Sequence, residues 1–174
     1  MNRFAVVLLA GASLCQGAGW VKLFDGKTLN GWTVHSGIAT YKVEQGAILG
    51  TAVLGSSNTF LCTDKEYGDF VLEFEVKVDP PLNSGVQFRS QIFKEGETLK
   101  FEDQGKTVER KLPVDRVYGY QVEIAAGKGG NSGNVYDEAR RGRFLDDFKG
   151  KPGADIVLKD GQWNKYRVEC KGDS

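Results

Sequence analysis

Three segments of the chain carry polar side chains at every second position, the spacing at which residues of a β-strand share one face. Carboxylates in such positions could move protons, while amides and a guanidinium could bond hydroxyl groups. If the three segments are neighbouring strands, their polar side chains form one surface suited to a polyhydroxylated ligand. The residues are Glu73, Glu75 and Lys77, then Gln87, Arg89 and Gln91, and finally Gln121 and Glu123.

A solvated surface is the alternative explanation for the same pattern. Antiparallel sheets often expose a charged face, whose cross-strand ion pairs contribute up to about 1 kcal/mol. We favour this explanation for Glu73 and Lys77. We favour ligand binding for Arg89, Gln121 and Glu123, because amide-rich strands flanked by glycine turns are less usual on a merely solvated face.

The elements that would position these residues are predicted to be strands throughout. Residues 70–78 show the clearest apolar and polar alternation, and Gln45-Gly46 is typical of a hairpin turn. Residues 94–115 predict a long loop or loose hairpin, and residues 161–170 a last strand. With 23 glycines and no long helical pattern, the chain is expected to be an all-β sandwich of two antiparallel sheets.

The charge balance argues against two classes of partner. Lys plus Arg and Asp plus Glu both number 23, so no net field attracts nucleic acid or an anionic membrane. Phosphate loops and nucleophile elbows are missing from the sequence. His35, the only histidine and expected in a loop, rules out a metal site built on several histidines.

The first 18 residues are typical of a signal peptide. Arg3 precedes an apolar run, and small residues allow cleavage between Ala12 and Ala18. We therefore expect residues 19–174 to form one domain, secreted or periplasmic, with no integral membrane segment after signal removal. Lipidation of Cys15 is disfavoured because Leu14 precedes it.

The remaining cysteines and the end of the chain leave further questions. Cys62 and Cys170 could form a disulfide or remain two separate buried thiols, and we favour separate thiols because neither spacing nor metal-ligand clustering supports a bridge. The chain stops in "KGDS", which has turn character, so we expect a sandwich that lacks its C-terminal strands.

Six blocks of sequence, in this order, resemble one family. They are "LFDGKTLNGW", "YGDFVLEFEVKV", "LNSGVQFRS", "GYQVEI", "SGNVYDEARRG" and "GQWNKYRVEC". They resemble the 3-keto-disaccharide hydrolases, once called DUF1080 and also described as 3-keto-glucoside 1,2-lyases and 3-keto-2-hydroxy-glucal hydratases. The resemblance implies a concanavalin-like, laminin-G-like jelly roll of bacterial exported proteins. It also implies a carbohydrate substrate and a partner sugar oxidoreductase.

The chemistry implied by this resemblance is elimination from a 3-keto sugar followed by hydration. Glu123 is the candidate base, with Glu75 as its substitute, and Arg89 would stabilise the oxyanion, with a divalent metal ion as a further stabiliser. Many members read Glu-x-Gln where this chain reads Gln121-Val122-Glu123, a swap that keeps the parity. The candidate substrate-binding residues are Gln87, Gln121, Asn83, Tyr136 and Asp137.

A non-catalytic carbohydrate-binding or adhesion module of laminin-G-like fold is the alternative function. Fold alone favours neither function. Such a module would be expected to carry aromatic platforms or an acidic calcium loop, and neither is clear in the sequence. The predicted inward carboxylates favour the enzyme.

Overall fold

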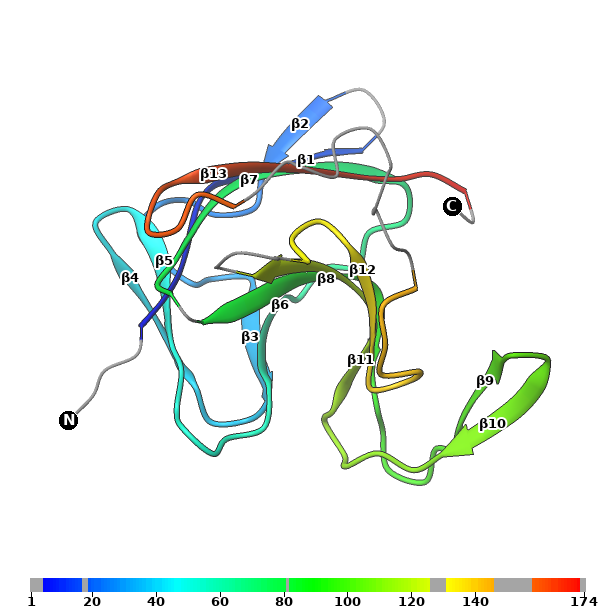
Figure 1. Cartoon of the computed structure of the whole chain (residues 1–174). Helices are drawn as coiled ribbons and strands as arrows, with labels where there is room; N and C mark the ends of the chain where they lie inside the picture. The colour runs from blue at the N-terminus through cyan, green and yellow to red at the C-terminus, as the bar shows by residue number, and fades with distance from the viewer. Residues whose placement is uncertain (1–4, 17–18, 81, 126–130, 146–157, 173–174) are drawn as a thin grey trace. The chain divides into compact units, whose positions relative to one another are not determined.

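The computed structural model describes residues 5–16, 19–80, 82–125, 131–145 and 158–172, and of residues 5–16 the backbone alone. The chain divides into two compact units, Met1–Leu82 with Lys159–Ser174, and Asn83–Leu158. Every strand pair is antiparallel, and the described residues contain no helix (Figure 1). The prediction of an all-β fold is therefore confirmed, with antiparallel sheets as in a concanavalin-like and laminin-G-like jelly roll.

The described residues of the first unit form eight strands in two sheets. They are β1 (Ala5–Gln16), β2 (Gly19–Lys22), β3 (Trp32–Ser36), β4 (Thr40–Glu44), β5 (Ala47–Thr51), β6 (Thr59–Thr63), β7 (Phe70–Val78) and β13 (Asn164–Cys170). The larger sheet has the order β13-β7-β1-β5-β4, with β2 paired to β1, and β3 pairs with β6. His35 lies in β3, so its expected place in a loop is wrong.

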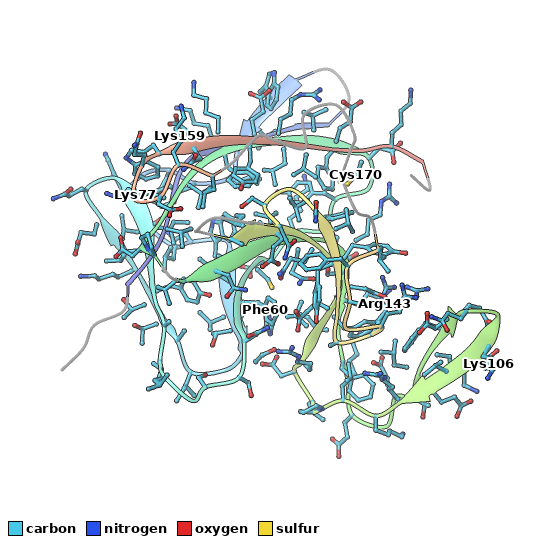
Figure 2. The ribbon with its side chains drawn as sticks, in the orientation of Figure 1. Phe60, Lys77, Lys106, Arg143, Lys159 and Cys170 are labelled. Atoms are coloured by element: carbon cyan, nitrogen blue, oxygen red, sulfur yellow. The ribbon has the colours of Figure 1, made fainter. Side chains whose placement is uncertain are left out.

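Alternation along β7 builds the core of this unit. Phe74, Val76 and Val78 are at most 3% exposed, as the sequence predicted. The predicted hairpin is also confirmed, since Gln45 and Gly46 join β4 to β5 with positive φ angles of 51° and 76°. Such a two-residue turn matches the right-handed twist of its strands. Cys62 is not joined in a disulfide to Cys170, which Figure 2 labels.

The N-terminal segment is a strand in this structure. β1 lies between β5 and β7, with Leu8 opposite both Leu49 and Lys77. Residues 1–18 are predicted to be a signal peptide that lies outside the domain. The structure contains β1 because it is that of the unprocessed chain. Removal of residues 1–18 would remove this strand. The signal peptide stays a prediction. Among the described residues, no helix has the length and apolar character needed to cross a membrane.

In the part of the second unit that the structure describes, the strands form a three-stranded sheet and a hairpin. Its strands are β8 (Asn83–Ile92), β9 (Leu99–Asp103), β10 (Lys106–Arg110), β11 (Val117–Ala125) and β12 (Val135–Glu138). The sheet has the order β12-β11-β8, and β9 pairs with β10, which confirms the loose hairpin predicted in residues 94–115. This unit carries most of the residues that the sequence singled out.

A β-bulge interrupts the pairing of β8 with β11. Tyr118 lies opposite Gln91 and Tyr120 opposite Phe88, so Arg89 and Ser90 together face Gly119. Arg89 has a φ of 48° and Gly119 a φ of 141°. A bulge inserts one extra residue and breaks the alternation of side chains. The predicted single parity from Gln87 to Gln91 is therefore wrong.

Candidate functional site

Five side chains of β8 and β11 form a continuous hydrogen-bonded row, which we call the polar chain. Its members are Ser90, Gln87, Gln121, Glu123 and Asn83. Ser90 Oγ donates to Gln87 Oε1 (2.6 Å), and Gln87 Nε2 donates to Gln121 Oε1 (2.9 Å). Gln121 Nε2 donates to Glu123 Oε2 (2.8 Å), and Asn83 Nδ2 donates to Glu123 Oε1 (3.1 Å). The row thus ends on a carboxylate.

Strand register explains why these side chains meet. Gln121 lies directly opposite Gln87, and Glu123 lies opposite Gly85. Directly opposed residues of an antiparallel pair project to the same face. Four of the residues chosen from the sequence, Gln87, Gln121, Glu123 and Asn83, are therefore brought together.

Gly85 gives the row the space it needs. A Cβ atom at Gly85 would lie 2.3 Å from Cδ and 2.4 Å from Cγ of Gln121. The Gln121 side chain therefore lies across the backbone of β8 at a point where any other residue would displace it. This requirement for glycine is steric, since the φ of Gly85 is not positive.

Glu123 is buried, at 6% exposure, and accepts a hydrogen bond on each carboxylate oxygen. A buried charge is tolerated when hydrogen bonds replace its water shell. Both donors are neutral amides, so the carboxylate is hydrogen-bonded without a positive charge beside it. The two hydrogen bonds fix the orientation of the carboxylate, as the geometry of a general base requires.

Tyr136 and Asp137 project to opposite faces of the second unit's sheet. Tyr136 lies opposite Gln121, on the face of the polar chain, whereas Asp137 lies opposite Tyr120. Asp137 is fully buried and binds Arg140 Nε and Arg141 Nη1, each at 2.6 Å. Of the two predicted substrate-binding residues, only Tyr136 shares a face with Glu123, and Asp137 holds the following turn.

The hydroxyl of Tyr136 is suited to donate a hydrogen bond. Burial raises the pKa of Tyr136 above 10.0, and the nearby carboxylates, with Glu123 among them, raise it further. A raised pKa keeps the hydroxyl protonated across neutral and mildly alkaline pH. Its ring packs edge-on against Phe144 at 5.2 Å between centroids, which orients the side chain.

Arg89 is not part of the polar chain. It is exposed, and it lines a cavity with Arg140, whose guanidinium lies 4.3 Å from the centre of the Tyr120 ring. Tyr120 precedes Gln121 and projects to the other face. Glu123 pairs with Gly85 across the sheet, and Arg89 lies four residues further along β8 than Gly85. This separation along the strand is about 13 Å. The predicted partnership of Arg89 with Glu123 thus has no support in their positions.

The polar residues of β7 lie in a different sheet. β7 pairs with β1 and β13 and not with β8 or β11, so the condition for one surface over three strands is not met. Glu75 lies opposite Lys165, and Arg167 Nε is 3.7 Å from Glu73 Oε1. Opposite charges paired across strands in this way are typical of a solvated face. A solvated face is the explanation that we favoured from the sequence for Glu73 and Lys77.

Sequence reasoning missed three residues of this region, Gly85, Ser90 and Gly119. A Cβ at Gly119 would lie 2.7 Å from the Ser90 Cα, so only glycine allows the bulge that turns Ser90 toward Gln87. Glycines within the strand-like segments "NSGVQF" and "VYGYQV" were an available signal, since glycine inside a strand often marks a bulge or a close approach. No comparable signal pointed to Ser90.

The described part of the chain contains no group of three or more His, Cys, Asp or Glu side chains placed to hold a metal ion. The polar chain supplies one carboxylate, two glutamine amides, one asparagine amide and one hydroxyl. This mixture of donors and acceptors is suited to bonding the hydroxyls of a sugar.

Fold and site together define an all-β protein with a hydrogen-bonded row of polar side chains on one face of an antiparallel sheet. The sequence profile of the 3-keto-alpha-glucoside-1,2-lyase-like domain matches residues 19–174. The chain belongs to this family, as the six sequence blocks indicated. A comparison with curated proteins found no significant match.

Proposed function

We propose that this protein cleaves 3-keto-glycosides by proton abstraction, elimination and hydration, with Glu123 as the base. The family is of the 3-keto-glucoside lyase type, which supports the general activity. The observation that carries the assignment of Glu123 is its carboxylate, held by two neutral amide donors on the face that also carries Tyr136.

The first step uses the acidity that a 3-ketone gives to the C2 hydrogen. Glu123 accepts the C2 proton, and the electrons of the C2–H bond form a C2=C3 enolate with negative charge on O3. The enolate then reforms the ketone, a C1=C2 double bond forms, and the C1–O bond to the aglycone breaks. The protonated Glu123 returns its proton to the departing oxygen.

The second step adds water to the 3-keto-glycal. A hydroxide equivalent bonds to C1 and a proton to C2, so the sum of both steps is hydrolysis of the glycoside. Neither an oxidant nor a reductant is consumed. The ketone must exist beforehand, which calls for a sugar oxidoreductase acting earlier on the same substrate.

The enolate needs a hydrogen-bond donor that does not protonate the base. We assign this role to the Tyr136 hydroxyl, which its raised pKa keeps protonated. Gln87 and Gln121 bind sugar hydroxyls, and Gln121 and Asn83 hold the Glu123 carboxylate. Arg89 and Glu75 are left out of this mechanism, Arg89 because it lines a cavity on the other face and Glu75 because it lies in another sheet.

Export belongs to the same proposal. The family match begins at residue 19, directly after the apolar N-terminal segment. This boundary supports removal of residues 1–18 and action outside the cytoplasm.

Aglycone release from a chromogenic 3-keto-glucoside tests the proposal. Glu123→Gln keeps the size and hydrogen-bonding capacity of the side chain but cannot accept the C2 proton, so release should fall by about 100-fold or more. Glu102→Gln, at an exposed position of β9, makes the same chemical change away from the polar chain and should retain the wild-type rate.

Two outcomes would count against the enzyme. Wild-type protein that binds the 3-keto-glucoside without releasing the aglycone would be a binding module of the same fold. Equal release by wild type and Glu123→Gln would remove Glu123 from the reaction.

A further inference from the structure

Ser90 is separated from Glu123 by three hydrogen bonds of the polar chain and takes no part in the reaction steps proposed above. It joins the polar chain through the β-bulge of β8, where Arg89 and Ser90 together face Gly119. Without the bulge, strict alternation would place Ser90 on the opposite face of the strand from Gln87. The bulge therefore turns this hydroxyl onto the face that carries the polar chain.

The backbone at the bulge has a conformation that strands avoid. Arg89 has a φ of 48°, in the left-handed region that residues other than glycine rarely adopt. Gly119 approaches so closely that a Cβ there would lie 2.5 Å from Ser90 Oγ. Strained backbone of this kind clusters at functional sites, and bulges beside such sites re-aim side chains. The side chain that this bulge re-aims is Ser90.

The charge of Glu123 decides which way the two glutamine amides of the polar chain point. An ionised carboxylate only accepts hydrogen bonds, so Gln121 must turn its Nε2 toward Glu123 Oε2, at 2.8 Å. The Oε1 of Gln121 then needs a donor, which Gln87 Nε2 supplies at 2.9 Å. Gln87 Oε1 is left as an acceptor at the end of the polar chain remote from the carboxylate.

Ser90 supplies the donor that this direction requires. Its Oγ lies 2.6 Å from Gln87 Oε1, at the short end of the range for O–H···O hydrogen bonds. The same oxygen lies 3.1 Å from the Phe88 carbonyl oxygen and 3.4 Å from that of Tyr120. The hydroxyl has a single proton, and the shortest of the three contacts is the one to Gln87.

The bond from Ser90 affects the far end of the polar chain. Hydrogen bonds that follow one another in the same direction polarise and strengthen each other. A side chain without a hydroxyl at this position would leave the part-buried Gln87 Oε1 without this donor and would remove the preference for one amide direction. The hydroxyl of Ser90 therefore favours amide N–H groups, and not amide oxygens, at the Glu123 carboxylate.

We propose that Ser90 is a positioning residue for the base, acting on Glu123 through the side-chain amides of Gln87 and Gln121. It holds both amides in the direction that presents N–H groups to the carboxylate, and so it orients the carboxylate for proton abstraction. The catalytic part of this role rests on the proposed function, whereas the coupling along the polar chain is a property of the folded protein alone.

Side-chain amide NMR of the whole protein tests the coupling. Ser90 is bonded to Gln87 and not to Gln121, so a change at Ser90 reaches the Nε2–H₂ signals of Gln121 through one intervening amide. Ser90→Ala should shift these signals. Ser84→Ala makes the same chemical change in β8, opposite Ile124 and outside the polar chain, and should leave them unchanged.

Cutting the polar chain separates this coupling from a structural effect of the bulge. In a Gln87→Ala background, Ser90→Ala should no longer shift the Gln121 signals, because the connecting amide is absent. Equal shifts in both backgrounds would show that Ser90 acts through the backbone and would overturn the proposal. Unshifted Gln121 signals in Ser90→Ala alone would overturn it as well.

Aglycone release from the 3-keto-glucoside measures the catalytic consequence. Ser90→Ala should lower kcat by about two- to tenfold, the loss expected for one neutral hydrogen bond, and should cause no further loss in the Gln87→Ala background. Full kcat in Ser90→Ala would overturn the positioning role. Wild-type protein that releases no aglycone would instead refute the proposed function, and the NMR measurement would still decide the coupling.

Discussion

Replacing Gly85 with alanine gives a stability test of the polar chain. The new Cβ would lie 2.3 Å from Cδ of Gln121, far inside contact distance, so this side chain must move. Moving it breaks the bond from Gln87 and the bond to the Glu123 carboxylate. A neutral hydrogen bond contributes about 0.5–1.5 kcal/mol and one to a charged group about 1.5–3 kcal/mol.

The sign of the effect follows from comparing two terms. Glycine to alanine at a compatible backbone stabilises by about 0.4–1 kcal/mol, through the unfolded chain. The lost bonds outweigh this gain, so Gly85→Ala should lower the free energy of unfolding by about 1–4 kcal/mol. Gly68, with no atom within 4 Å of its would-be Cβ and no positive φ, is the matched control. Gly68→Ala should be neutral or slightly stabilising.

Urea unfolding of four proteins measures this directly as a double-mutant cycle. They are wild type, Gly85→Ala, Gln121→Ala and the double variant. Because Gln121→Ala removes the obstructing atoms, Gly85→Ala should have no destabilising effect in that background. An equal loss of stability in both backgrounds would refute the steric reasoning.

Three other predictions concern the bulge, a half-buried tyrosine and the N-terminal segment. Gly119→Ala should lower the free energy of unfolding by about 3 kcal/mol or more, measured by thermal unfolding. The reason is that the alanine would have a φ of 141° and a Cβ only 2.7 Å from the Ser90 Cα. Burial raises the pKa of Tyr41 to about 12 from 10.0, so stability should fall as pH rises from about 10 to 12, and Tyr41→Phe should flatten this fall. Intact mass of exported protein should show cleavage between Ala12 and Ala18, and a retained Met1 would contradict it.

Local patterns in the sequence were enough to predict much of the fold. The alternation along β7 predicted its buried face, and Gln45-Gly46 predicted the β4–β5 hairpin. Both features depend on residues that are neighbours along the chain. Strand pairing depends on contacts far apart in sequence, and this is why β7 was wrongly expected beside β8 and β11.

Parity explains both the success and the failure at the site. Gln87, Gln121 and Glu123 were chosen correctly as one face, since alternation holds without interruption over their part of the strands. Arg89 was grouped with them because a bulge leaves no mark in alternation. Its only trace in the sequence was Gly119, whose role became clear from its positive φ and its close approach to Ser90.

The exchange of the C2 hydrogen tests the central claim most directly. A 3-keto-glucoside is incubated with enzyme in deuterated water, and NMR follows incorporation of deuterium at C2 in recovered substrate and product. With wild type we expect deuterium at C2 of the product, because the hydration step adds a solvent proton there. With Glu123→Gln we expect C2 exchange and aglycone release to be lost together while the fold is retained. Aglycone release by wild type with no deuterium at C2, or exchange that persists in Glu123→Gln, would contradict the proposed role of Glu123.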